Sequence, residues 1–107
     1  MQKNAEIGML LDCYQGLLTQ KQADVLTLYY EEDLSLTEIT EHYHITRQAV
    51  LDMIRRGEKQ LYYYEDRLAL LRRRQRNQQL LQQIEQLAAE LPREQARQIV
   101  SLAGEME

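Results

Sequence analysis

Only four glycines and one proline occur among the 107 residues of this chain. Strands and hairpins need such turn residues in number, so their scarcity favours long helices joined by short turns. Apolar residues also recur every three or four positions through much of the sequence, which is the period of a helix buried on one side. We therefore expect an all-α fold with one compact domain and a helical arm.

Capping patterns predict where several helices begin. Thr19 with Gln22, and Ser35 with Glu38, each form a capping box, in which the first side chain accepts from a backbone amide and the second reaches back. Thr46 is a further N-cap candidate. We expect a first helix over residues 7–18 and further helices after each of these three caps.

The helix that begins at Thr46 is expected to be long, because apolar residues continue at helical spacing as far as Leu71. Gly57 within it costs about 1 kcal/mol relative to alanine, or it marks the close packing of another helix. A second apolar series ends at Leu91, and Pro92 separates it from a short helix over residues 94–103. This pattern predicts a helix-turn-helix domain of residues 1–61, followed by a basic helical arm with a short C-terminal helix over residues 62–107.

Charge is distributed unevenly along the chain, whose net charge is −4. Residues 1–54 carry three basic and nine acidic side chains, residues 55–76 carry eight basic and three acidic ones, and residues 77–107 carry two basic and five acidic ones. The central block is either the solvated face of a long helix or a surface for an anionic partner. Such a partner would have to approach this block, because the acidic N-terminal helices would repel it.

Residues 35–61 have the plan of a helix-turn-helix, with a short turn at residues 43–45 and a second helix beginning at Thr46. In this motif the second helix enters the major groove of DNA and presents its first turns to the base edges. The expected core positions are Ile39, Ile45, Val50 and Met53. The expected outward positions are Thr46, Arg47, Gln48, Leu51, Asp52 and Arg55.

The outward residue types suit nucleic acid only in part. An arginine can fork to guanine and a glutamine can pair with adenine, which favours base reading by Arg47, Arg55 and Gln48. Leu51 cannot hydrogen-bond to bases, and Asp52 either repels phosphate or selects cytosine. Contacts with phosphate groups are expected from Arg56, Lys59, Arg72, Arg73 and Arg74.

Residues 18–61 are similar to the C-terminal promoter-recognition helix-turn-helix of bacterial sigma factors. The matching segments are Leu18-Thr19, Leu34-Ser35-Leu36 with Glu38-Ile39, and Thr46-Arg47-Gln48-Ala49-Val50. One departure is His44, which stands where sigma-type turns usually have glycine or a small polar residue. That position tends to need a positive φ, and histidine is among the few other residues enriched there.

Over nearly its whole length the chain resembles the YlxM family of small helix-turn-helix proteins, notably in residues 13–19 and 46–50. In that family a sigma-type unit, winged-helix-like but without a wing, precedes a basic helical arm. The family's genes lie beside those of the signal recognition particle. The resemblance implies a regulatory or accessory role in that targeting pathway, with DNA, the particle's RNA or its GTPase components as partners.

A protein-interaction module is the alternative function. In that case a stripe of apolar residues on the arm would pair with a second copy, forming a homodimer, or with a targeting GTPase. The stripe consists of Leu68, Leu71, Leu81, Ile84, Ala88 and Leu91.

Three consecutive tyrosines, Tyr62 to Tyr64, suggest a platform on which bases could stack. Three successive helical residues span about 200°, however, so we expect one ring to pack inward and two to point outward.

Other kinds of site have little support in the sequence. Neither a glycine-rich phosphate loop nor a nucleophile elbow is present, so we expect no enzyme and no cofactor. His42 and His44 do not share a helix face and Cys13 is distant, so we expect no metal site, and Cys13 should be a small buried residue. The single cysteine, the absence of a signal-peptide pattern and the lack of a long apolar run predict a cytoplasmic protein that does not insert into membranes.

Overall fold

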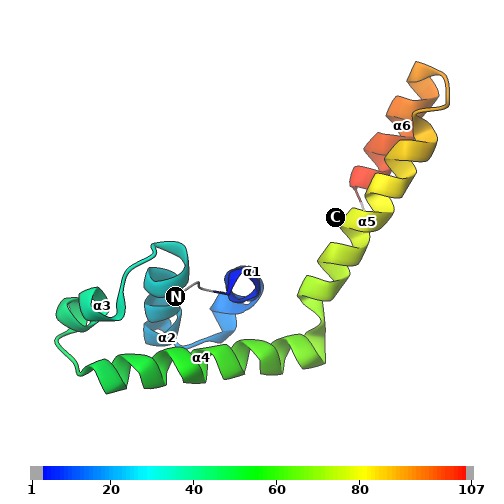
Figure 1. The fold of residues 1–107 in the computed structure, drawn as a ribbon. Coiled ribbons are helices and arrows are strands. Elements are labelled where there is room, and N and C mark those ends of the chain that lie inside the picture. The colour runs from blue at the N-terminus through cyan, green and yellow to red at the C-terminus, as the bar shows by residue number, and fades with distance from the viewer. Residues whose placement is uncertain (1–3, 106–107) are drawn as a thin grey trace. The chain divides into compact units, whose positions relative to one another are not determined.

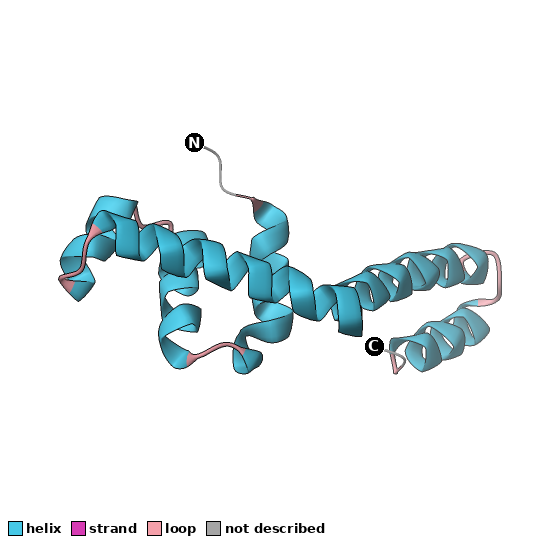
Figure 2. Cartoon of the chain, turned by 90° about the horizontal axis from the view of Figure 1, so that it is seen from below, coloured by secondary structure: helices cyan, strands magenta, loops and turns pink. Residues whose placement is uncertain are grey.

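The computed structural model of the chain describes residues 4–105, which form an all-α fold with six α-helices (Figure 1). No strand occurs among these residues (Figure 2). The helices are α1 Ala5–Tyr14, α2 Gln20–Leu26, α3 Leu36–Tyr43, α4 Arg47–Leu68, α5 Leu70–Ala88 and α6 Arg93–Gly104. The predicted fold class is confirmed.

Two compact units make up the chain, Met1–Ala69 and Leu70–Glu107. The predicted division between residues 61 and 62 lies within α4, which continues to Leu68. The last two turns of α4 stay with the first unit because Leu61 is fully buried and Tyr64 donates to the carbonyl oxygen of Leu17 at 3.2 Å. The helix ends where Ala69 adopts a left-handed conformation with φ of 53°.

The predicted caps form in the structure. The side chains of Thr19 and Ser35 accept from backbone amides three residues later. In return, Oε1 of Gln22 and Oε1 of Glu38 accept from the backbone amides of Thr19 and Ser35, which completes both capping boxes. Thr46 Oγ1 accepts from the amide of Ala49 at 3.1 Å and so fixes the start of α4.

Helices α1, α2 and α3 each contact α4, and the core of the first unit lies among them. The helix-turn-helix prediction is confirmed for Ile39 and Val50, which are fully buried. Ile45, in the turn before α4, and Met53 are only half-buried. The inward stripe of α4 runs through Val50 and Ile54, which leaves Met53 beside it. This stripe continues through Gly57 and Leu61, at the spacing of one helix face.

Gly57 lies where α2 crosses α4 closely. A Cβ atom at this position would be 2.5 Å from Cδ1 of Leu26, and Leu26 is fully buried. The interpretation of Gly57 as a close-packing site is therefore confirmed.

The first helix ends earlier than expected, and the second changes its hydrogen-bonding pattern before it ends. α1 stops at Tyr14 and passes into a 3₁₀ turn, Gln15–Leu17, which leaves Leu17 half exposed rather than on the buried stripe. α2 passes into a π turn, Thr27–Glu31, closed by the amide of Glu32 donating to the carbonyl oxygen of Thr27. Within this wider turn, Tyr29 is buried and Tyr30 is half-buried.

In the second unit, α5 and α6 pack side by side as a helical hairpin (Figures 1 and 2). Pro92 precedes α6, as predicted from the sequence. Of the predicted apolar stripe, Leu71 and Ala88 are buried, whereas Leu68 and Leu91 are exposed. None of the helices in the described part of the chain is long and apolar enough to cross a membrane.

Candidate nucleic-acid interface

The turn between α3 and α4 gives the helix-turn-helix its geometry. His44 caps α3 in a left-handed conformation with φ of 55°, as expected from the sequence. The chain then becomes extended at Thr46, whose side chain caps α4. Because Ile39 and Val50 are both buried on the inner side, the first turns of α4 keep their opposite side toward solvent.

The structure places nearly all the predicted residues of α4 on its surface. The exposed ones are Thr46, Arg47, Gln48, Asp52, Arg55, Arg56 and Lys59. Leu51 is half-buried and belongs partly to the packing of the helix.

Two of the predicted base-reading side chains are bound to each other. Nε2 of Gln48 donates to Oδ1 of Asp52 at 3.1 Å, one helical turn away. Arg47 helps to line a hollow of about 380 Å³ together with two carboxylate residues, Asp33 and Glu38. These neighbours make the first turns of α4 a surface of mixed charge.

Two carboxylates in the second half of α4 are held by tyrosines of earlier elements. The hydroxyl of Tyr14 donates to Oε1 of Glu65 at 2.7 Å, and the hydroxyl of Tyr30 donates to Oε1 of Glu58. Burial, followed by the nearby Glu58, raises the pKa of Tyr30 well above its ordinary range. Glu58 and Glu65 are thereby fixed on one flank of the helix.

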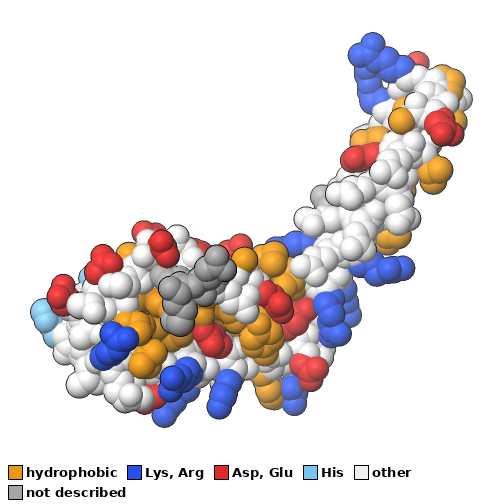
Figure 3. Space-filling view, in the orientation of Figure 1, with side chains coloured by type: hydrophobic (Ala, Val, Ile, Leu, Met, Phe, Trp, Pro, Cys, Tyr) orange, Lys and Arg blue, Asp and Glu red, His pale blue; other side chains and the backbone are white. Residues whose placement is uncertain are grey.

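The other flank of α4 carries a hollow of about 470 Å³ between α2 and α4, which we call the α2–α4 groove. Its lining residues are Gln22, Arg56, Lys59, Gln60 and Tyr63. The guanidinium carbon of Arg67 lies 3.6 Å from the centre of the Tyr63 ring, so these two groups are stacked. Figure 3 shows basic side chains spaced along the surface of α4.

The three consecutive tyrosines divide as expected. Tyr62 and Tyr63 are exposed, while Tyr64 packs inward against the ring of Tyr14, with the ring centres 5.9 Å apart. The sequence interpretation did not identify the groove itself. The recurrence of Arg56, Gln60 and Tyr63 every three or four residues could have indicated a shared helix face, but nothing local connects Gln22 to it.

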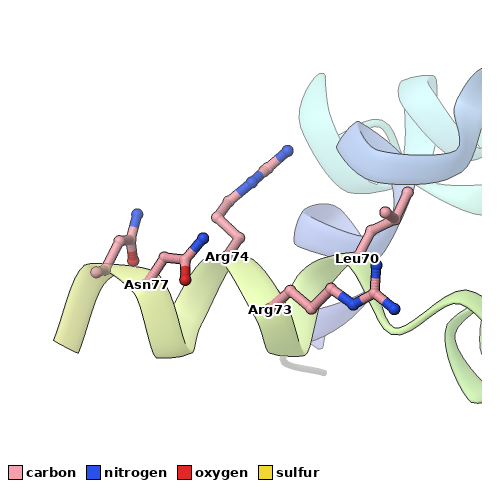
Figure 4. Close-up of a pocket in the computed structure, with 5 residues that line it drawn as sticks. Leu70, Arg73, Arg74 and Asn77 are labelled. Carbon is pink, nitrogen blue, oxygen red and sulfur yellow. The ribbon is translucent and has the colours of Figure 1, made fainter. Parts of the chain in front are cut away.

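The arginines expected to bind phosphate from the arm belong to the second unit. Arg72, Arg73 and Arg74 are exposed near the start of α5. Arg73 and Arg74 line a shallow hollow with Leu70, Asn77 and Gln78 (Figure 4).

Side chains that could ligate metals do not gather in the described residues. No group of three or more histidine, cysteine or acidic side chains there could hold a metal ion. The ring of His42 packs edge-on against Tyr43, with centres 4.7 Å apart. Cys13 is only half-buried, so the expectation that it is a buried residue is wrong.

Comparison with known proteins agrees with this architecture. Residues 1–101 match the family UPF0122, described as "Putative helix-turn-helix protein, YlxM / p13 like". Relatives named UPF0122 protein from Bacillus thuringiensis (strain Al Hakam) and Bacillus mycoides (strain KBAB4) are each 47% identical over 90 residues. A relative from Bacillus anthracis (strain A0248) is 46% identical, and each of the three alignments covers 84% of this chain and 82% of the relative. The chain therefore belongs to the UPF0122 family of YlxM/p13-like helix-turn-helix proteins.

Proposed function

We propose that this protein is a regulatory or accessory nucleic-acid-binding protein of the cytoplasm, in which the first turns of α4 enter the major groove of a duplex. The observation that carries the proposal is the start of α4, which follows the left-handed turn at His44, is capped by Thr46 and faces solvent. Arg47 and Arg55 are the proposed base-reading residues, because Asp52 holds the amide group of Gln48. Arg56 and Lys59 are the proposed phosphate contacts.

The proposal includes a place in the targeting pathway of the signal recognition particle. The family resemblance supports it, because genes of this family lie beside those of the particle. The duplex would then be DNA or a helical segment of the particle's RNA, and the arginines at the start of α5 would add phosphate contacts. Retrieval of the protein from cells with and without nuclease tests this role, because it separates partners held through DNA or RNA from protein partners such as the particle's GTPases.

The duplex-binding proposal is tested with the double variant Arg47→Ala, Arg55→Ala. Each lost bidentate contact should weaken binding by about 1–3 kcal/mol, whereas the salt dependence of the dissociation constant should become shallower when the phosphate contacts are removed in Arg56→Ala with Lys59→Ala. The matched control is Arg93→Ala with Arg97→Ala, which removes the same charge from two exposed positions of α6. Titration of a labelled duplex at several salt concentrations measures both quantities. Unchanged affinity in Arg47→Ala with Arg55→Ala, or an unchanged salt slope in Arg56→Ala with Lys59→Ala, would contradict the assignment.

A second candidate function is self-association through the arm. Large apolar side chains remain exposed on the second unit, and Leu87 and Leu102 are 71% and 65% exposed. Two such faces would bury each other in a homodimer, which could carry two copies of the reading helix. Light scattering at tens of micromolar tests this candidate, and a strictly monomeric protein would exclude it. If the protein is dimeric, Leu87→Glu with Leu102→Glu should shift it to a monomer.

A further inference from the structure

The α2–α4 groove has a chemistry of its own that the duplex-reading turns of α4 do not share. It contains two cationic side chains, Arg56 and Lys59, and two amides, Gln22 and Gln60. Its described lining residues include no carboxylate. Glu58 and Glu65, on the opposite flank of α4, accept hydrogen bonds from tyrosines. The second half of α4 therefore separates its cationic groups from these two acidic ones.

An aromatic platform lies at one end of this cationic surface. Tyr63 is half exposed, and the guanidinium group of Arg67 is stacked on its ring. Both the tyrosine ring and the guanidinium plane are surfaces on which nucleic-acid bases stack. The cationic side chains can bind phosphates, the amides can bind base edges, and the flat surface can stack with a base. Together these groups match the parts of a nucleotide. The groove volume of about 470 Å³ lies within the range of small-ligand sites.

The position of the groove along α4 determines which kind of nucleic acid it suits. Tyr63 comes 16 residues after Arg47, which is about 24 Å along a helix axis at 1.5 Å per residue. The major groove of a duplex is only about 12 Å wide. When the first turns of α4 read a duplex, Tyr63 therefore lies beyond its flanking phosphates. The faces of paired bases are also stacked inside a duplex, where a tyrosine ring cannot reach them.

We propose that the α2–α4 groove binds unpaired nucleotides of a strand that extends from the duplex. Where the duplex carries such an extension, Arg56 and Lys59 hold the phosphates of the extension instead of duplex phosphates. Gln22 and Gln60 contact base edges, and one base stacks on the Arg67–Tyr63 pair. This inference rests on the proposed duplex binding only for the placement of the strand. The groove itself can be tested with a single strand alone.

The test compares three labelled probes with the full-length chain: a blunt duplex, the same duplex with a single-stranded extension of about eight nucleotides, and that extension alone. Each probe is made as DNA and as RNA, with the extension at either end, so that the preferred strand is identified. Tyr63→Leu should weaken binding to the extension by at least about fivefold and leave the blunt duplex unchanged. Tyr63→Phe should bind as the unsubstituted protein does.

Tyr62→Leu is the matched control, because Tyr62 is an adjacent exposed tyrosine that does not line the groove. It should change binding to each probe by less than about twofold. The proposal is overturned if the protein binds no single strand, or if Tyr63→Leu binds the extension with unchanged affinity. It is also overturned if Tyr62→Leu and Tyr63→Leu weaken binding to the extension equally. Loss of blunt-duplex binding in Tyr63→Leu would also overturn it, because Tyr63 would then contribute to the binding of paired strands. If the single strand binds through Tyr63 while no duplex binds, the duplex-binding proposal fails and the groove assignment is supported.

Discussion

Replacing Gly57 by alanine should destabilise the protein, although the same change usually stabilises a helix. Alanine is favoured over glycine inside a helix by about 1 kcal/mol. The new Cβ atom, however, would lie 2.5, 3.1 and 3.3 Å from Cδ1, Cγ and Cδ2 of Leu26. Leu26 has no exposed surface through which it could move aside, and overpacking of such a core typically costs about 1–3 kcal/mol. The net expectation is a loss of about 1 kcal/mol, since the steric cost exceeds the gain in helix propensity.

Gly8→Ala provides the matched control for this prediction. Gly8 lies inside α1, and nothing is within 4 Å of the position that its Cβ atom would take. This variant should therefore gain the propensity term alone, about 0.5–1 kcal/mol. Because propensity contributes to both variants, the difference between them isolates the clash with Leu26.

Urea unfolding followed by tyrosine fluorescence measures both variants. All seven tyrosines lie between residues 14 and 64, so the signal reports the first unit. In a Leu26→Ala background, Gly57→Ala should become neutral or stabilising, because the clashing atoms are gone. Equal stabilisation by Gly8→Ala and Gly57→Ala would refute the reasoning.

Three other changes should alter stability for reasons visible in the structure. Ala69→Gly should raise the free energy of urea unfolding by about 0.5–1 kcal/mol, because Ala69 has a φ of 53°, which strains any residue other than glycine. Circular dichroism follows the unfolding. A lower free energy of unfolding in the variant would contradict this strain. Burial and Glu58 raise the pKa of Tyr30 above its ordinary value of 10, so the stability that the protonated hydroxyl contributes is complete below pH 10 and is lost as the pH rises further. Tyr30→Phe should therefore reduce the loss of stability at alkaline pH in unfolding curves. An identical pH profile in the variant would contradict this role of Tyr30. Partial desolvation and the neighbouring Asp12 raise the pKa of the exposed Glu31 carboxyl above its ordinary value of 4.5, so its ionisation weakens folding as the pH rises through the raised value. Because solvent screens an exposed group, Glu31→Gln should raise the midpoint of thermal unfolding only slightly at pH 7 and lose this advantage below pH 4.5. An advantage that does not change with pH would exclude the ionisation.

Features that depend on a few neighbouring residues could be predicted from the sequence. The capping boxes at Thr19 and Ser35 need only two side chains three positions apart, and they form as predicted. The left-handed turn at His44 follows in the same way from a residue type and its place in the motif. Such signals are local, so tertiary packing did not override them.

Features that depend on distant contacts could not be predicted. The break at Ala69 interrupts a continuous apolar period, and alanine is ordinarily the best helix former. The burial of Ile54 instead of Met53 depends on the direction from which α1 and α2 approach α4. The α2–α4 groove likewise requires Gln22 to lie beside a helix that begins 25 residues later, at Arg47.

The π turn at Thr27–Glu31 has a consequence for how the family varies in length. A π turn holds one more residue per hydrogen-bonded ring than an α-helical turn. Deleting one residue here would restore ordinary helical hydrogen bonds and leave the segments on either side intact. Homologous chains that differ by a single residue between α2 and α3 should therefore have gained or lost it in this turn, where the fold absorbs the change within one helical turn.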